Sequence, residues 1–166
     1  MEKRSDLIDA ITDESRRHYA AYVLFNQALA ARLALHPSDL QCLSLLSLDA
    51  EPRTIGDVAT LTGLTSGAAT RLVDRLEHAG LVRRFPDQRD RRRMWVELTP
   101  SSEIDVAAAW DGPGRAFASV LDGYRRDELT VILDYLRRAG DVARAETERL
   151  SSVDDAGALD QGSRRA

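Results

Sequence analysis

The sequence predicts a mainly α-helical fold that includes one small β-hairpin, and three observations support this prediction. Apolar residues recur at helical spacing over most of the chain. Two short helical segments near the middle are separated by a turn that contains glycine. The stretch that follows them, RRFPDQRDRRRMWVELT at residues 83–99, combines turn residues with alternating apolar and polar residues, which is typical of a hairpin.

The composition of the 166-residue chain is ordinary for a soluble globular protein, with 43% hydrophobic and 30% charged residues. No apolar run reaches the about 20 residues that a membrane span needs, and the N-terminal segment lacks the apolar core of a secretory signal. The single cysteine, Cys42, cannot form an internal disulfide. We therefore expect a cytoplasmic protein with no membrane partner.

The charge of the chain is unevenly distributed. Residues 64–95 hold eight arginines against four acidic residues, a net charge of +4, which leaves −8 for the rest of a chain whose formal charge is −4. Six of those arginines lie within residues 83–93. A solvated charge run is one interpretation of such a segment. A basic patch on an acidic body instead indicates a polyanionic partner at one face.

Helical patterns occupy both ends of the chain. The segment from about Ser5 to Leu35 contains neither glycine nor proline and predicts one long amphipathic helix. Pro37 restarts a second helix, in which we expect the core face Leu40, Leu43, Leu46 and Leu48. After Pro100 we expect a helix at residues 104–110, a break at residues 112–114, a long last helix to about Leu150 and a disordered tail.

The middle of the chain predicts a helix-turn-helix. Thr54 and Asp57 have the spacing of a capping box, and Gly63 is a natural left-handed helix stop. Thr65 then caps a second helix that Gly80 ends. The apolar positions of this second helix fall at the spacing i, i+3, i+4 and i+7 and are Ala69, Leu72, Val73 and Leu76. The second helix of such a unit can lie in a DNA major groove.

The residues off this apolar stripe are candidate DNA contacts. Small and hydroxyl side chains allow close approach to DNA, and arginine can read guanine or hold phosphate. The candidates on this helix are Thr65, Ser66, Gly67, Thr70, Arg71 and Arg75. A hairpin follows, with one strand that starts at residues 81–82, a returning strand at 94–99 and turn residues at 86–90. A cationic hairpin directly after a helix-turn-helix is a wing.

The stretches TIGDVATLTGLTSGAATRLVDRLEHAGLVRR and DRRRMWVELT together resemble the MarR family of multiple-antibiotic-resistance-type regulators. The resemblance implies a homodimer held by the N- and C-terminal helices, a recognition helix at residues 65–79 in the major groove and a wing in the adjacent minor groove. By its wing motif, Arg92 is the minor-groove arginine, and Asp90 of the Asp90-Arg91-Arg92 triplet holds the wing arginines. Arg89 and Arg93 are further wing candidates, with Arg93 either a phosphate contact or merely exposed.

The resemblance divides the chain into an N-terminal dimerisation helix at 1–35, a DNA-binding lobe at 36–99, C-terminal dimerisation helices at 100–150 and a tail at 151–166. It also implies a small phenolic or lipophilic effector bound between the dimer helices and the lobe. Candidate ligand residues are His18, Tyr19, Tyr22, His36 and Trp110. The alternative is that these aromatic residues form dimer core and that the histidines are exposed or satisfied.

Other classes of protein are not favoured. Nothing in the sequence has the pattern of a catalytic or phosphate-binding motif, the histidines and Cys42 lack metal-ligand spacing, and no cofactor is implied. Cys42 lies in an apolar run and is expected to be buried and inert. We expect a regulator, most simply a repressor that binds a palindromic operator in double-stranded DNA as a homodimer and is released by a small molecule. The alternative is a winged helix that contacts other proteins.

Overall fold

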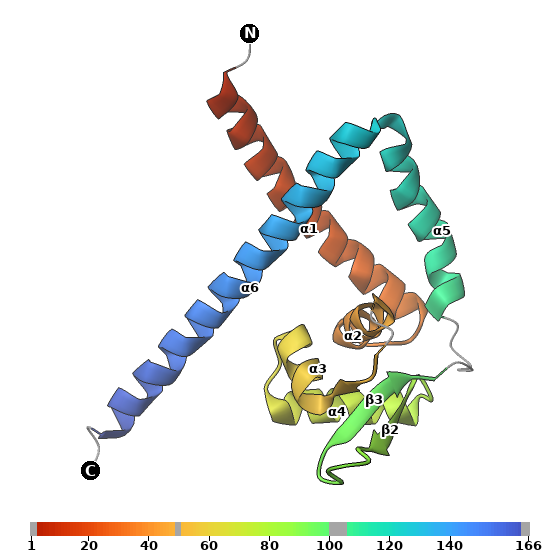
Figure 1. Ribbon diagram of the computed structural model, residues 1–166, viewed down its shortest axis with the longest axis vertical. Coiled ribbons are helices and arrows are strands. Elements are labelled where there is room, and N and C mark those ends of the chain that lie inside the picture. Colours follow the sequence, from red (N-terminus) through yellow and green to blue (C-terminus); the bar gives the residue numbers. More distant parts are fainter. Residues whose placement is uncertain (1–2, 49–50, 100–105, 164–166) are drawn as a thin grey trace. The chain divides into compact units, whose positions relative to one another are not determined.

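The computed structural model describes residues 3–48, 51–99 and 106–163, with side chains up to residue 150 (Figure 1). Six α-helices, three strands and one 3₁₀ turn follow one another in this part of the chain. In chain order they are α1 (Arg4–Arg32), α2 (Pro37–Leu48), β1 (Arg53–Thr54), α3 (Ile55–Thr62), α4 (Ser66–His78), β2 (Val82–Pro86), β3 (Met94–Leu98), α5 (Val106–Ser119), η1 (Val120–Gly123) and α6 (Arg126–Ser163). The predicted fold class, helical with a small hairpin, is confirmed.

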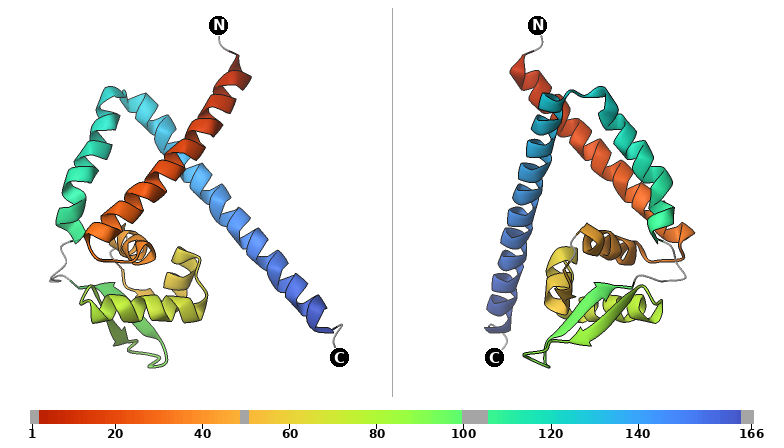
Figure 2. Two further views of the ribbon diagram at one scale, coloured as in Figure 1. Left: turned by 180° about the vertical axis from the view of Figure 1, so that it is seen from behind. Right: turned by 45° about the vertical axis from the view of Figure 1, so that its right-hand side comes forward.

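The chain divides into two compact units, Met1–Asp111 and Gly112–Ala166. In the first unit, α2, α3, α4 and the sheet pack together into one lobe, and the tip of the hairpin extends beyond them (Figure 2). Helix α1 runs away from this lobe toward the N-terminus. The lobe therefore carries the helix-turn-helix, formed by α3 and α4, and the hairpin on a single packed body.

Local sequence signals explain the helix-turn-helix. The Thr54 hydroxyl accepts a hydrogen bond from the Asp57 N–H at 3.1 Å, and the Asp57 carboxylate accepts one from the Thr54 N–H at 2.8 Å, which is the predicted capping box at the start of α3. Gly63 ends α3 with a φ of +67°, a backbone conformation that side-chain-bearing residues rarely adopt. The Thr65 hydroxyl caps α4 by accepting from the Ala68 N–H at 3.3 Å. The two helices thus begin and end as expected.

The core of the lobe lies between α2, α3, α4 and the sheet. All four predicted apolar positions of α4 are buried, and they pack with Leu43, Leu46, Val58 and Val96, among others. The sheet has the order β1-β3-β2 and is antiparallel. The two-residue strand β1, which the sequence does not predict, pairs Arg53 with Val96 and Thr54 with Trp95. One predicted core residue is wrong, because Leu48 is 79% exposed. It lies about 200° around α2 from buried Leu46.

The C-terminal part differs from the prediction in two places. Helix α5 continues through Pro113, where we expected a break, and the helix gives way only at η1. A proline removes one hydrogen bond without forbidding a helix, and neither flanking glycine adopts a positive φ. Helix α6 continues to Ser163 instead of giving way to a disordered tail at residue 151. Residues 151–163 contain no proline, so nothing in them blocks extension of a helix already formed.

Candidate nucleic-acid interface and cavity

The first part of the candidate interface is the N-terminal half of α4. Its buried stripe fixes which face is turned to the core, and this leaves Thr65, Ser66, Gly67 and Arg71 exposed. The half-buried Thr70 hydroxyl donates to the Ser66 carbonyl oxygen at 2.9 Å. Gly67 has no side chain beside Arg71, so no side-chain atoms protrude there and the backbone of α4 is accessible next to one cationic group. Such a surface allows close approach of a groove edge.

A buried ion pair anchors the middle of α4 to α2. The Asp39 carboxylate, with a side chain only 6% exposed, accepts hydrogen bonds from Arg75 Nε at 3.1 Å and from Arg75 Nη2 at 2.6 Å. The hydrogen bond to Asp39 raises the pKa of Arg75 above its ordinary value. Arg75 therefore has a structural partner that the sequence does not predict. Its side chain as a whole remains half-exposed.

The arginines of the lobe fall into two groups. Arg83 pairs with Glu97 across the sheet, and Arg84 pairs with Asp74 and, at 3.6 Å, with Glu77. These pairs neutralise the base of the hairpin and tie it to α4. Within the described part of the chain, no ion pair involves the remaining exposed arginines at the tip and on α4, which are Arg71, Arg89, Arg91, Arg92 and Arg93. Unpaired positive charge is therefore concentrated on the N-terminal half of α4 and the wing tip.

Asp87 organises the tip of the wing. One oxygen of its carboxylate accepts from the Arg89 N–H at 2.7 Å and the Asp90 N–H at 3.0 Å, and the other accepts from the Trp95 indole N–H at 2.8 Å. These hydrogen bonds, first those from the backbone, lower the pKa of Asp87 below its ordinary value. The carboxylate thus ties both strands of the hairpin to its turn.

Asp90 has a smaller part than the family motif implies. Its carboxylate accepts one hydrogen bond, from the Arg92 backbone N–H at 3.0 Å, and among the described residues it forms no ion pair with an arginine side chain. Arg93 lies over the Trp95 ring, with 5.2 Å between its guanidinium carbon and the ring centroid. A cation over an indole is an attractive arrangement. Arg93 is therefore partly engaged at the root of the tip, while Arg89, Arg91 and Arg92 project from it.

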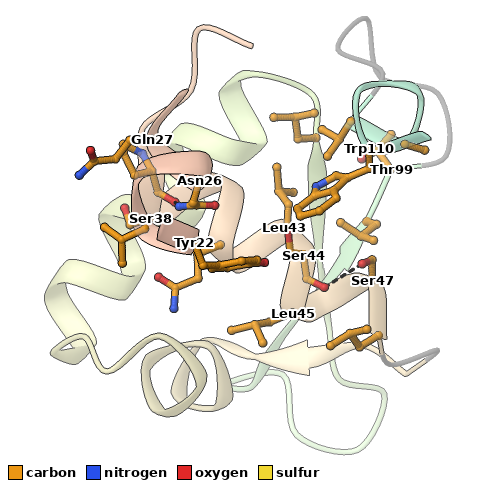
Figure 3. Close-up of a pocket in the computed structure, with 18 of the residues that line it drawn as sticks. Tyr22, Asn26, Gln27, Ser38, Leu43, Ser44, Leu45, Ser47, Thr99 and Trp110 are labelled. Atoms are coloured by element: carbon orange, nitrogen blue, oxygen red, sulfur yellow. Dashed lines mark hydrogen bonds between the residues drawn. The ribbon is translucent and has the colours of Figure 1, made fainter. Parts of the chain in front are cut away.

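A cavity of about 960 Å³ lies in the same unit, between α1, α2, the end of β3 and the start of α5 (Figure 3). Three of the predicted ligand residues, Tyr19, Tyr22 and Trp110, line it. His18 and His36 do not. The ring centroid of His18 is 6.4 Å from that of Tyr22, and His36 Nδ1 is 2.8 Å from the Ser38 hydroxyl oxygen. Both histidines therefore contact residues close to them in the sequence.

Cys42 is buried in the core of the lobe, with 2% of its surface exposed. Burial, and to a lesser degree the Asp39 charge, raises the pKa of its thiol to about 11. A protonated, inaccessible thiol is unreactive, which agrees with the expectation from its apolar surroundings. Among the described residues, no group of three His, Cys, Asp or Glu side chains could hold a metal ion. No helix there is long and apolar enough to cross a membrane.

Comparison with known proteins decides the family. A MarR family model matches residues 35–93, which span α2 to the wing tip. The HTH-type transcriptional regulator YcgE of Bacillus subtilis is 35% identical over 147 residues, which cover 89% of this chain and 95% of YcgE. The chain belongs to the MarR family. It is a DNA-binding transcriptional regulator rather than an enzyme.

Solved MarR family structures have the same fold. A MarR family transcriptional regulator from Silicibacter pomeroyi superposes with a TM-score of 0.65 at 25% identity, covering 88% of this chain and 95% of that one. BpsR of Bordetella bronchiseptica superposes with a TM-score of 0.55 at 23% identity, covering 84% and 94% of the two chains. The MarR fold thus accounts for most of this chain, including the helices on both sides of the lobe.

Proposed function

We propose that this MarR family regulator is a repressor that binds a palindromic operator as a homodimer and leaves it when a small molecule occupies the cavity. The observation that carries the DNA-binding half is the distribution of arginines. The base of the hairpin is neutralised by internal ion pairs, whereas the wing tip and the N-terminal half of α4 keep unpaired arginines. A winged helix that contacts other proteins does not require that arrangement.

Each part of the interface has a distinct role in the proposal. The N-terminal half of α4 enters the major groove, where Ser66, Gly67 and Thr70 allow close approach and Arg71 reads a base or holds a phosphate. The wing tip enters the adjacent minor groove, whose negative potential is strongest in A·T-rich sequence. Arg92 is the arginine placed in that groove, and Arg89 and Arg91 contact the flanking backbone.

Exposed apolar surface on the long helices supports the homodimer. Large apolar side chains of α1, α5 and α6 are exposed in the single chain, and contiguous exposed apolar surface is typical of protein–protein contacts. Examples are Leu7, Ile8 and Ile11 of α1, Phe117 of α5, and Val131, Leu136 and Val142 of α6. We propose that residues 1–35 and 100–150 bury these side chains against a second copy of the chain. Two lobes related by a two-fold axis would read half-sites whose centres lie about 10–10.5 base pairs apart.

The cavity supports regulation by a small molecule. It is bounded by α1 and α5 on one side and by α2 of the lobe on the other, so that an occupant contacts both the long helices and the body that carries α4. The DNA binding of BpsR is regulated by 6-hydroxynicotinic acid. A ligand shifts an equilibrium only if it binds the two states with different affinity. Occupation of the cavity would favour a dimer whose two recognition helices do not match the operator spacing.

The test is selection of genomic DNA fragments by the purified protein, carried out at low and at moderately high salt. Recovery of one short palindrome, bound more weakly at high salt, is expected, because each neutralised phosphate releases counterions. Recovery of no sequence above background would contradict operator binding and favour the protein-contacting alternative. An operator complex with one protein chain per site would contradict the homodimer. A regulator of chromosomal genes would act in the cytoplasm.

A further inference from the structure

We infer that the cavity takes an uncharged aromatic molecule that carries an amide or hydroxyl group, and that it rejects aromatic carboxylates. The inference rests on the proposed ligand response and adds the chemical class of the ligand. It is carried by the side chains that line the cavity, by the hydrogen bonds that close the start of α2, and by one serine hydroxyl without a partner.

The lining of the cavity is largely apolar, with aromatic and polar residues but no charged ones. Neither a charged side chain nor a histidine lines it in the part of the chain that the structure describes. Its volume is within the range of sites for small organic ligands. A buried carboxylate needs a cation or several hydrogen-bond donors, and the lining contains no cationic side chain. The aromatic and polar groups that are present include Tyr22, Asn26, Gln41, Ser44, Thr99 and Trp110.

The start of α2 borders the cavity at Pro37 and Ser38, and a helix N-terminus is ordinarily a place where anions bind. In this protein the backbone N–H groups at the start of α2 already donate to His36. Pro37 has no N–H, the Ser38 N–H donates to His36 Nδ1 at 3.3 Å, and the Asp39 N–H donates to the His36 carbonyl at 2.9 Å. The Leu40 N–H donates to the same carbonyl at 3.1 Å. The residues that begin α2 therefore offer no free backbone donor to a carboxylate.

The nearest fixed charge on this turn is negative. Asp39 follows Ser38 in the chain and is buried, and its partner Arg75 is held by two hydrogen bonds and does not line the cavity. Because Arg75 is engaged by Asp39, this turn offers no free cation to an anionic ligand.

Ser44 supplies a hydrogen-bonding group that lacks a partner. Its hydroxyl is buried and forms no hydrogen bond within the described residues, although Ser44 lines the cavity. Buried hydroxyls without a partner are uncommon and unfavourable. The neighbouring Ser47 is different, because its hydroxyl donates to the Ser44 carbonyl oxygen at 2.7 Å (Figure 3). A ligand amide or hydroxyl would satisfy Ser44 after rotation of its side chain toward the cavity.

Matched pairs of neutral and anionic compounds test the inference. The probes are 4-hydroxybenzamide against 4-hydroxybenzoate, and 6-hydroxy-2-naphthamide against 6-hydroxy-2-naphthoate. Binding is measured by calorimetry and by quenching of Trp110 fluorescence in a Trp95→Phe variant, which leaves one tryptophan. We expect at least one carboxamide to bind, about tenfold or more tighter than its carboxylate, because burial of an unpaired carboxylate is far more costly than burial of an amide.

Three substitutions make the test specific to the cavity. Ser44→Ala should weaken carboxamide binding several-fold, and Thr60→Ala, at an exposed hydroxyl of α3 outside the lining, should leave it unchanged. Gln41→Arg places a cation in the lining and should narrow or reverse the preference for the carboxamide. Because Gln41 is exposed, this variant is expected to fold normally.

Three results would overturn the inference: equal or tighter binding of the carboxylates, no binding of either carboxamide, or unchanged selectivity in Gln41→Arg. Operator affinity of the unliganded protein is measured in parallel. If the protein binds its operator but a carboxylate releases it, the proposed function holds and the ligand class is wrong. If the protein binds no operator, the proposed function itself fails, whatever the cavity binds.

Discussion

The Asp39 carboxylate on α2 and the Arg75 guanidinium on α4 form a paired contact through two hydrogen bonds of 3.1 and 2.6 Å, across 36 residues of sequence. Asp39 is buried and Arg75 is half-exposed. The pair fixes α4 against α2, and the same turn of α2 borders the cavity. It also means that Arg75 and Arg71, two arginines one turn apart on α4, have different roles.

Substitution of these two arginines should separate stability from DNA binding. Arg75→Ala leaves the buried Asp39 charge without its partner and should lower the free energy of unfolding by about 1–3 kcal/mol, less than for a fully buried pair because Arg75 is half-exposed. Arg71→Ala should leave that free energy within about 0.5 kcal/mol of the wild type and weaken operator binding by about 1–3 kcal/mol. Urea unfolding and fluorescence anisotropy measure the two quantities. Equal loss of stability in both variants would contradict the structural role of Arg75.

Asp87 should matter more to the wing than Asp90. Asp87→Ala removes three hydrogen bonds, two within the turn and one to the Trp95 indole, whereas Asp90→Ala removes one. We expect Asp87→Ala to weaken operator binding several-fold more than Asp90→Ala, although both remove one negative charge and should by charge alone strengthen binding. Because the tip is exposed, neither should change the thermal unfolding midpoint appreciably. A larger loss of affinity in Asp90→Ala would restore the role that the family motif implies for that residue.

Sequence patterns predicted the elements whose causes are local. The capping box at Thr54, the stop at Gly63 and the buried stripe of α4 follow from spacing within a few residues, and the structure confirms them. The hairpin was also predictable, since alternation and turn residues are local signals. The residues of the candidate interface could therefore be named in advance, although their contacts with DNA stay predictions.

What the sequence could not predict depends on contacts between distant segments or on weak local preferences. Asp39 and Arg75 pair across 36 residues, and the division of the arginines into paired and unpaired groups depends on the cross-strand register of β2 and β3. The Asp87–Trp95 hydrogen bond has a local hint, an aspartate in the turn, but the family motif points to Asp90 instead. Helix α5 continues through Pro113 because the loss of one backbone hydrogen bond does not by itself end a helix.

The capping box of α3 should make stability depend on pH in the acid range. Hydrogen bonds from Thr54, first that of its side chain, lower the pKa of Asp57 below the ordinary value of 3.8. A carboxyl group whose pKa is lowered by folding contributes its full stabilisation at pH values above its ordinary, unfolded-state pKa. This contribution is lost as the pH falls through the lower, folded-state pKa. Asp57→Asn should therefore be less stable than the wild type at pH 7, and the difference should shrink below about pH 3.8. A difference that does not change between pH 7 and pH 3, measured by urea unfolding, would contradict this account.

Cys42 should be unreactive in the folded protein. Its thiol is buried and has a pKa of about 11, so almost no thiolate is present or accessible at neutral pH. Iodoacetamide should label it only after unfolding, and operator affinity should be insensitive to hydrogen peroxide in both the wild type and Cys42→Ser. Rapid labelling of the native protein, followed by mass spectrometry, would show that the lobe opens or that the thiol has a sensing role.

The most direct test of the central claim is the operator affinity of two double variants that have the same change in charge. One is Arg71→Ala with Arg92→Ala, from α4 and the wing tip; the other is Arg138→Ala with Arg144→Ala, exposed arginines of α6. If α4 and the wing read DNA, the first pair should weaken binding by about a hundredfold or more, and the second by no more than a few-fold. Equal losses in the two double variants, or no loss in the first, would contradict the account.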